Sequence, residues 1–170
     1  MSKKNGRYPI FRIDPDYEPP ARESRELFGI TLEQERNNFV PNNTFFTQTV
    51  TKRTKLSSAA RRDLTVATIT AKYTQSNSVC LAIDGQVIGN GAGQQSRIQC
   101  FRLAASKADN WFLRQHPRVR EMTFCPKLKR QDKINAVDTF LQGESNPAET
   151  NAWRANFVTL PKRLETDEIG

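Results

Sequence analysis

The sequence predicts a mixed α/β fold. Three observations support this: a β-hairpin pattern at residues 78–89, a long helical pattern directly after it, and a capped helical segment before it. A chain of 170 residues has the length of one domain, or of a piece of one. A hydrophobic share of 36% allows only a modest core.

The element before the hairpin is predicted as a helix over residues 58–72. Ser57 or Ser58 can accept hydrogen bonds from the first N–H groups of a helix. Ala59, Leu64 and Ala71 then recur at about helical spacing.

A β-hairpin is predicted next. Asp-Gly at 84–85 separates two β-prone runs at 78–83 and 86–89, which is a strong short-range hairpin pattern.

A glycine-rich segment, GNGAG at 89–93, leads from the hairpin into a helix predicted over 94–115, with Pro117 as its stop. One face of that helix is apolar and is expected to meet the core: Ile98, Phe101, Ala105, Ala108 and Phe112. Glycines before a helix can bring backbone N–H groups to an anion. They can equally serve only to turn a strand into a helix, and the pattern leaves both interpretations open.

Two polar residues beside this segment are candidates for binding a ligand. Arg97 lies in the first helical turn, where its guanidinium could hold a phosphate. Asn77 ends a polar run and could offer both a donor and an acceptor to a planar amide or base. Its alternative interpretation is a turn or cap asparagine.

The two ends of the chain are less regular. Residues 8–13 predict a short strand that leads into a proline-rich linker at 14–20, and residues 22–50 predict no firm element. Ile134, Val137 and Leu141 predict one short helix, and Trp153 with Phe157 predicts another. Residues 121–170 are therefore expected to form a helical appendage to a domain at 1–120, with 165–168 as a frayed end or a cut boundary.

Charge and composition limit the possible functions. The net charge is +8, and the thirds 1–60, 61–120 and 121–170 carry +3, +6 and −1, so an anion is expected to bind the middle third. No apolar run suits a membrane span or a secretory signal, which predicts a soluble cytoplasmic protein with no membrane partner. Nucleic-acid binding by this basic third is the less favoured interpretation, because Phe101 and Phe112 are assigned to the core.

Cysteine and histidine usage argues against several chemistries. Cys80, Cys100 and Cys125 are widely spaced and odd in number, which favours neither a disulfide framework nor a zinc finger. His116 is the only histidine, and it is interpreted as a residue near the end of a helix rather than as a catalytic base or metal ligand.

Four segments together resemble the transformylase domain of the AICAR transformylase/IMP cyclohydrolase family, where AICAR is 5-aminoimidazole-4-carboxamide ribonucleotide. They are 72–79 (KYTQSNSV), 84–89 (DGQVIG), 91–98 (GAGQQSRI) and 107–111 (KADNW). Weaker similarity at 36–38, 62–69 and 129–138 extends the resemblance over essentially the whole chain, and 112–117 (FLRQHP) is similar to fungal members.

The resemblance implies a cytidine-deaminase-like α/β unit with a small helical insert. It implies that the domain transfers a formyl group from 10-formyltetrahydrofolate to AICAR, giving FAICAR, with no metal, in a cytoplasmic homodimer that also makes IMP. By residue, it assigns Asn77 and Arg97 to AICAR, and Ile98 and Asn135 to folate. The chain lacks the zinc signature of the deaminases, which excludes deamination.

The resemblance is incomplete in two respects. The Lys-His pair and the Phe-Phe-Pro-Phe stretch of the family do not occur in this chain, so it resembles an internal piece that is expected to be inactive alone. Some residues also differ from the family. Gln99 stands where the family has His, and Phe101 stands where it has Thr. Ala105-Ser106 replaces Gly-Asp, and Asn90 replaces an apolar residue. The alternative interpretation is a non-catalytic relic or dimer-assembly module of the same fold.

Overall fold

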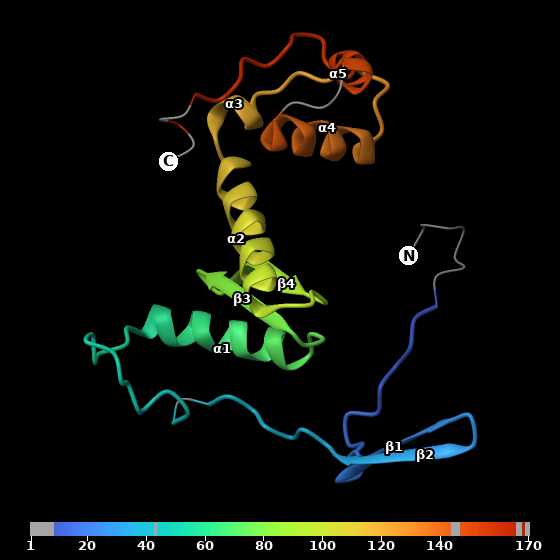
Figure 1. The fold of residues 1–170 in the computed structure, drawn as a ribbon, viewed down its shortest axis with the longest axis vertical. Coiled ribbons are helices and arrows are strands. Elements are labelled where there is room, and N and C mark those ends of the chain that lie inside the picture. Colours follow the sequence, from blue (N-terminus) through green and yellow to red (C-terminus); the bar gives the residue numbers. More distant parts are fainter. Residues whose placement is uncertain (1–8, 43, 144–146, 166–167, 169–170) are drawn as a thin grey trace. The chain divides into compact units, whose positions relative to one another are not determined.

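The computed structural model describes residues 9–42, 44–143, 147–165 and 168 (Figure 1). The chain divides into two compact units, Met1–Val40 and Pro41–Gly170, and each is described by itself. Both units contain antiparallel strands and the second contains helices, so the predicted α/β class is confirmed. The predicted boundary near residue 120 remains a prediction.

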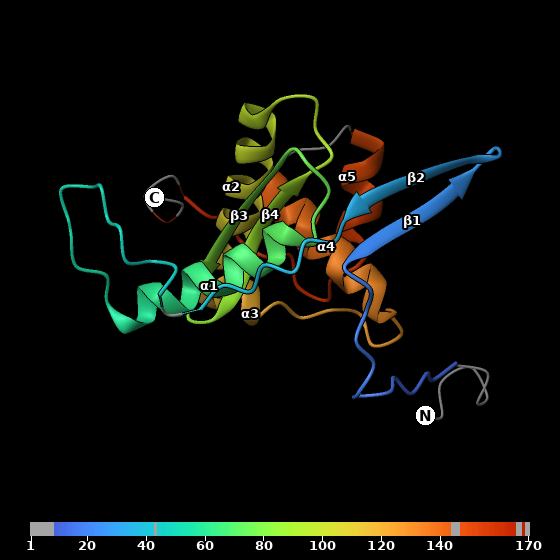
Figure 2. The same cartoon turned by 90° about the horizontal axis from the view of Figure 1, so that it is seen from below.

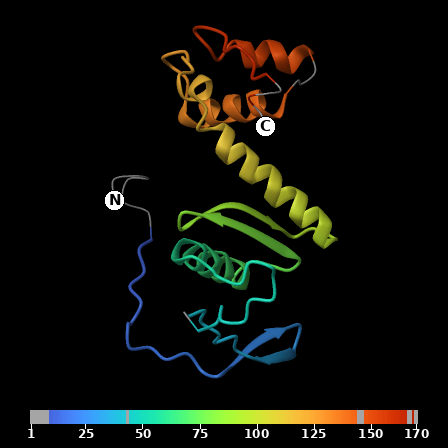
Figure 3. The ribbon, with the colours of Figure 1, turned by 90° about the vertical axis from the view of Figure 1, so that its left-hand side faces the viewer.

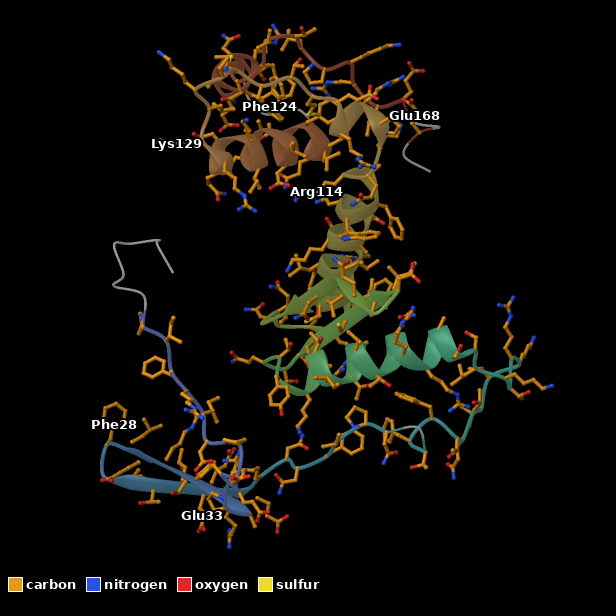
Figure 4. All side chains as sticks on the ribbon, turned by 180° about the vertical axis from the view of Figure 1, so that it is seen from behind. Phe28, Glu33, Arg114, Phe124, Lys129 and Glu168 are labelled. Carbon is orange, nitrogen blue, oxygen red and sulfur yellow. The ribbon has the colours of Figure 1, made fainter. Side chains whose placement is uncertain are left out.

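The first unit contains a β-hairpin that the sequence did not predict. Strand β1 (Arg22–Leu27) pairs antiparallel with β2 (Ile30–Glu35), and Leu27 faces Ile30 across the turn. Phe28 and Gly29 form this turn with φ of 53° and 76°, as in the tight turns that suit hairpins. Figure 4 labels Phe28 at the tip, where its side chain is fully exposed.

The strand predicted at residues 8–13 is wrong for the described residues 9–13, which form no regular element. Pro9 has no N–H to donate, and no described strand lies alongside to pair with this segment. Tyr8 lies outside the described residues.

The second unit is built around the predicted hairpin. Strand β3 (Ser78–Ile83) pairs antiparallel with β4 (Gln86–Ala92), and Asp84 and Gly85 form the turn with φ of 51° and 74°. Strand β4 extends beyond the predicted end at Gly89. Figure 2 shows the two strands running side by side.

A helix packs against each side of this hairpin (Figure 3). Helix α1 (Ser58–Lys72) confirms the predicted range, and the Ser57 Oγ caps it by accepting from Ala60 N at 3.1 Å. Helix α2 (Arg97–Leu113) is capped by Ser96 and is shorter at both ends than predicted.

Gly89 and Gly91 are glycines because α2 lies directly on β4. A Cβ at Gly89 would lie 2.1 Å from the Ala104 carbonyl oxygen, and one at Gly91 would lie 1.9 Å from the Cys100 carbonyl oxygen. Two of the five residues in the predicted anion loop therefore serve helix packing. Only Gly93, with φ of 68°, acts as a turn residue before α2.

The predicted core face of α2 is wrong. Cys100, Ala104 and Ala108 are buried against the hairpin, whereas Phe101 is 56% exposed and Phe112 is 49% exposed. Small side chains occupy the inner face because the glycine strand brings the two backbones close together. Of the residues predicted for the core face, Ala108 is the one that is buried.

Three helices follow α2: α3 (Pro117–Arg120), α4 (Arg130–Gln142), which contains the predicted Ile134, Val137 and Leu141, and α5 (Pro147–Arg154), which contains Trp153 but ends before Phe157. Pro117 begins α3 rather than only ending α2. The Trp153 Nε1 donates to the Ala136 carbonyl oxygen at 2.7 Å, and the rings of Phe124 and Phe157 pack with centroids 5.2 Å apart. The Arg114 side chain forms an ion pair with Asp138 and so links the end of α2 to α4. Figure 4 labels Arg114 at that end of α2.

Across the described part of the chain, every helix is too short or too polar to cross a bilayer.

Candidate functional site

The residues predicted to bind AICAR meet at the N-terminus of α2. Asn77 directly precedes β3, and Arg97 is the first residue of α2. The Arg97 Nη2 donates a hydrogen bond to the Asn77 Oδ1 at 3.3 Å. Two side chains 20 residues apart in sequence thus form one polar cluster. The peptide bond between Ser76 and Asn77 is cis.

Cys100 holds Asn77 from the core side. Its thiol donates to the Asn77 carbonyl oxygen at 3.0 Å, and its side chain is fully buried. Asn77 is half-buried, so its backbone is held by the core while its amide reaches the surface. The sequence analysis did not assign this role to Cys100. Cys100 lies one helical turn after Arg97, and this spacing could have indicated that the two residues lie close together.

The cluster is electropositive. Ser96 caps α2 by accepting from Gln99 N at 3.3 Å, and the first turn of α2 contains no acidic residue. The partial positive charge of a helix N-terminus therefore adds to that of the Arg97 guanidinium. Because Asn77 is a neutral partner, the hydrogen bond between them leaves the guanidinium charge available to an anion.

The predicted folate residues lie in two places. Ile98 follows Arg97 on α2 and is 65% exposed, so its apolar side chain lies at the surface beside the cluster. Asn135 lies on α4, where its Oδ1 accepts from the Gln131 Nε2 at 3.0 Å. The structure brings Asn77, Arg97 and Ile98 together and leaves Asn135 apart from them.

The length of α2 explains this separation. Its 17 residues span about 25 Å. Arg97 is at its start, and the ion pair of Arg114 with Asp138 joins α4 at its other end. Asn135 instead lines an open groove of about 470 Å³ between α4 and α5.

The residues that differ from the family pattern lie on α2 and on β4. Gln99, Phe101 and Ser106 are exposed on α2. Asn90 lies on β4, where its Nδ2 donates to the Thr74 Oγ1 at 3.2 Å. Its buried Oδ1 has no hydrogen-bond partner among the described residues.

Asp63 was not predicted, and it fixes the hairpin that places Asn77. From α1, its Oδ1 accepts from Gly85 N at 2.7 Å and its Oδ2 accepts from Asp84 N at 3.2 Å. The hydrogen bond from Gly85 lowers the pKa of Asp63, and Arg62 assists. Asp63 therefore ties α1 to the β3–β4 turn.

The other potentially reactive side chains make contacts that stabilise the fold. The His116 Nδ1 accepts from Arg118 N at 3.2 Å and caps α3. Burial raises the pKa of the Cys80 thiol, which disfavours the nucleophilic thiolate. Glu168 accepts from Glu165 N, which lowers its pKa, and it forms an ion pair with Arg118 at 2.6 Å, so it is not a detached end.

No group of three or more potential metal ligands lies close together in the described ranges. The hydrogen-bonded pair of Asn77 and Arg97 is a positively charged polar cluster. Such a cluster suits an anionic ligand with a planar polar group.

Comparisons with known proteins identify sequences similar to this chain. The profile of the AICARFT/IMPCHase bienzyme family matches residues 1–107. The bifunctional purine biosynthesis protein PurH of Bradyrhizobium diazoefficiens is 37% identical over 109 residues, which are 64% of this chain and 20% of that protein. PurH of Mesorhizobium japonicum is 37% identical over 107 residues, which are 63% of this chain and 20% of that protein.

The chain belongs to the AICARFT/IMPCHase bienzyme family. The resemblance recognised in the sequence is thereby confirmed. The chain spans about a fifth of the length of the curated relatives it matches. Its similarity to fungal members in particular remains a prediction.

Proposed function

We propose that this chain forms the AICAR-binding part of a formyltransferase domain in de novo purine biosynthesis. The observation that carries this proposal is the hydrogen bond of Arg97 to Asn77 at the N-terminus of α2. Family membership supports it, because PurH relatives are named as bifunctional purine biosynthesis proteins. IMP cyclohydrolase activity belongs to the same proposal for a full-length protein.

Each residue of the cluster has a distinct part in binding AICAR. The 5′-phosphate is an anion, which suits the Arg97 guanidinium and the helix N-terminus. Because Arg97 donates to the Asn77 Oδ1, the Asn77 amide is oriented with its NH₂ group directed away from Arg97. That NH₂ group can donate to the carboxamide oxygen of AICAR.

The proposed reaction moves a formyl group from 10-formyltetrahydrofolate to the 5-amino group of AICAR. The amine is a weak nucleophile, so the reaction requires positioning, a base for the amine proton and stabilisation of the tetrahedral oxyanion. The residues of this chain supply positioning, and the family's Lys-His pair is proposed to supply proton transfer from elsewhere. The isolated chain is therefore proposed to be inactive.

The folate assignments form a second part of the proposal. Ile98 is next to Arg97 and exposes an apolar side chain, which suits contact with a flat pterin ring beside AICAR. Asn135 is proposed to reach the same co-substrate from α4. We further propose that the chain has a cytidine-deaminase-like fold with a helical insert at 121–170. The full-length protein is proposed to be a homodimer in the cytoplasm.

Calorimetric titration of the 170-residue chain with AICAR tests this function. Arg97→Gln removes the charge that holds the phosphate, and we expect AICAR affinity to fall about 10- to 100-fold, because hydrogen bonds to charged groups contribute about 1.5–3 kcal/mol. Arg120→Gln removes the same charge from an exposed residue of α3 and serves as the control. Its affinity is expected to stay within about twofold of the unmodified chain.

Equal affinity of Arg97→Gln and the unmodified chain would contradict the proposal. Absence of AICAR binding by the folded unmodified chain would also contradict it. That second result would favour the alternative, a non-catalytic relic or dimer-assembly module of the same fold. The exposed face of α2 is the observation that favours this alternative.

A further inference from the structure

The segment that leads into α1 is strongly basic. Residues 44–62 contain five basic side chains and no acidic one. Three of the bases, Lys52, Arg53 and Lys55, lie in the exposed loop before α1 (Figure 1). Within the described part of the chain, none of the three forms an ion pair with a carboxylate. Cations without acidic partners attract polyanions to this loop.

A groove of about 690 Å³ lies on the first turns of α1, directly after this loop. It is lined by residues on one face of the helix: Ser58, Arg61, Arg62, Thr65 and Val66. The Arg61 Nη1 donates to the Phe46 carbonyl oxygen at 3.3 Å, which ties the preceding loop to the groove. The loop cations and the groove therefore form one surface.

The acidic residues that contact this surface are held by other groups. Asp63 and Asp84 form ion pairs with Arg62 at 3.2 and 3.3 Å. Asp63 also accepts hydrogen bonds from the backbone N–H groups of Asp84 and Gly85. These contacts direct both carboxylates towards Arg62 and the hairpin turn, and away from competition for the loop cations.

The groups around the groove favour single-stranded nucleic acid over an acidic protein. The Phe45 ring is 51% exposed, and a ring beside cations can stack on a base. Protein interfaces are depleted of lysine, whereas phosphates are bound by basic side chains and by hydroxyls such as that of Ser58. The reason for disfavouring nucleic acid, the assignment of Phe101 and Phe112 to the core, does not hold in the structure.

The groove is separate from the cluster of Asn77 and Arg97. Asp63 ties the start of α1 to the turn of the β3–β4 hairpin, whereas Asn77 precedes the open end of that hairpin. Strand β3 has 6 residues, so the two ends lie about 20 Å apart. Binding in the groove is therefore independent of AICAR binding.

We propose that the loop at 52–55 and the groove of α1 bind the phosphate backbone of single-stranded nucleic acid, with Phe45 stacked on a base. Lys52, Arg53, Lys55 and Arg61 contact phosphates. Four such contacts release counterions and give a slope of log K against log salt of about −3. The affinity is that of non-specific binding, with a Kd on the order of 1–10 μM at about 50 mM salt.

Fluorescence anisotropy of a labelled oligouridine of about 12 nucleotides, titrated with the 170-residue chain, tests this site. Measurements between about 50 and 200 mM salt give the slope. A duplex of the same length is expected to bind more weakly, because its bases are not available to Phe45. Polyglutamate of similar length and millimolar AICAR are both expected to leave the oligouridine bound.

A triple variant of the loop, Lys52→Gln with Arg53→Gln and Lys55→Gln, removes three of the four phosphate contacts. We expect its affinity at about 50 mM salt to fall tenfold or more, and its slope to change from about −3 to about −1. The matched control removes two lysines and one arginine from the exposed segment at 127–130: Lys127→Gln, Lys129→Gln and Arg130→Gln. Its affinity is expected to stay within about threefold of the unmodified chain, because those charges are not in contact with the strand.

Phe45→Leu separates stacking from charge. It keeps an apolar side chain and every base, so we expect affinity to fall about tenfold while the salt slope is unchanged. An unchanged affinity of Phe45→Leu would contradict the stacking. Circular dichroism of each variant verifies folding.

Four other results would overturn the proposal. The folded chain could fail to bind oligouridine at about 50 mM salt, or the control could lose as much affinity as the loop variant, which would show attraction by net charge alone. Displacement of oligouridine by polyglutamate would indicate an acidic protein as the partner. Displacement by AICAR would place the strand at Arg97 instead.

Discussion

At the residue scale, single side chains fix the position of the candidate site. Asn77 is held through its backbone by Cys100 and through its amide by Arg97. Asn77 and Arg97 could be selected as candidate residues because their surrounding segments resemble a known family, and their role in binding AICAR stays a prediction. Cys100 could not, because a thiol that donates to a backbone carbonyl has no sequence pattern of its own.

Asp63 determines how the hairpin turn responds to acid. Hydrogen bonds from Gly85 and Asp84 and the charge of Arg62 lower its pKa below the usual 3.8. A lowered folded-state pKa stabilises the fold above the unfolded pKa, and that stability is lost as pH falls through the folded pKa. The loss attributable to Asp63 therefore lies below about pH 4.

We expect Asp63→Asn to lower the melting temperature at pH 7, because a neutral amide is a weaker acceptor for two backbone N–H groups. The difference from the unmodified chain should shrink as pH falls below about 4, since the Asp63 carboxylate is then protonated. Thermal melts between about pH 2 and 7 measure this. Asp16→Asn removes the same charge from a residue outside α1 and the hairpin, and a similar profile for both variants would refute the role of Asp63.

At the element scale, the sequence predicted the β3–β4 turn, but it did not predict which face of α2 is buried. Asp84-Gly85 between β-prone runs predicted β3 and β4 correctly. Phe28-Gly29 forms a similar turn, but the flanking strands are rich in Arg and Glu and lack an alternating apolar pattern, so β1 and β2 were missed. The apolar periodicity of α2 was real, yet the glycine strand selects the face with small residues.

The close approach of α2 to β4 predicts a graded response to added methyl groups. In Gly91→Ala the new Cβ would lie 1.9 Å from the Cys100 carbonyl oxygen, so backbone must move, and we expect a loss of about 3 kcal/mol or more of unfolding free energy. Gly93→Ala meets no atom within 4 Å and is strained only by its φ of 68°. We expect that variant to lose about 1–2 kcal/mol.

Urea denaturation of the two glycine variants compares them directly. A loss for Gly91→Ala equal to or smaller than that for Gly93→Ala would show that α2 does not pack on β4 as described.

At the scale of the whole molecule, the chain is proposed to hold the substrate-binding part of a longer enzyme. Arg97, Asn77 and Ile98 gather at one end of α2, and the helical region with Asn135 begins beyond the other end. One continuous helix was predicted over 94–115, but sequence spacing could not predict that the Arg114–Asp138 ion pair joins α4 to its far end. Net charge did indicate the middle third, where the candidate cluster lies.

The most direct test of the central claim is an amide chemical-shift titration of the uniformly ¹⁵N-labelled chain with AICAR. We predict saturable shifts at Asn77, Ser78 and residues 96–98, around the hydrogen bond of Arg97 to Asn77. The amide chemical shifts of residues in the β1–β2 hairpin should not change. Shifts centred elsewhere, or a spectrum of the folded chain unchanged by millimolar AICAR, would contradict the claim that this chain holds the AICAR site.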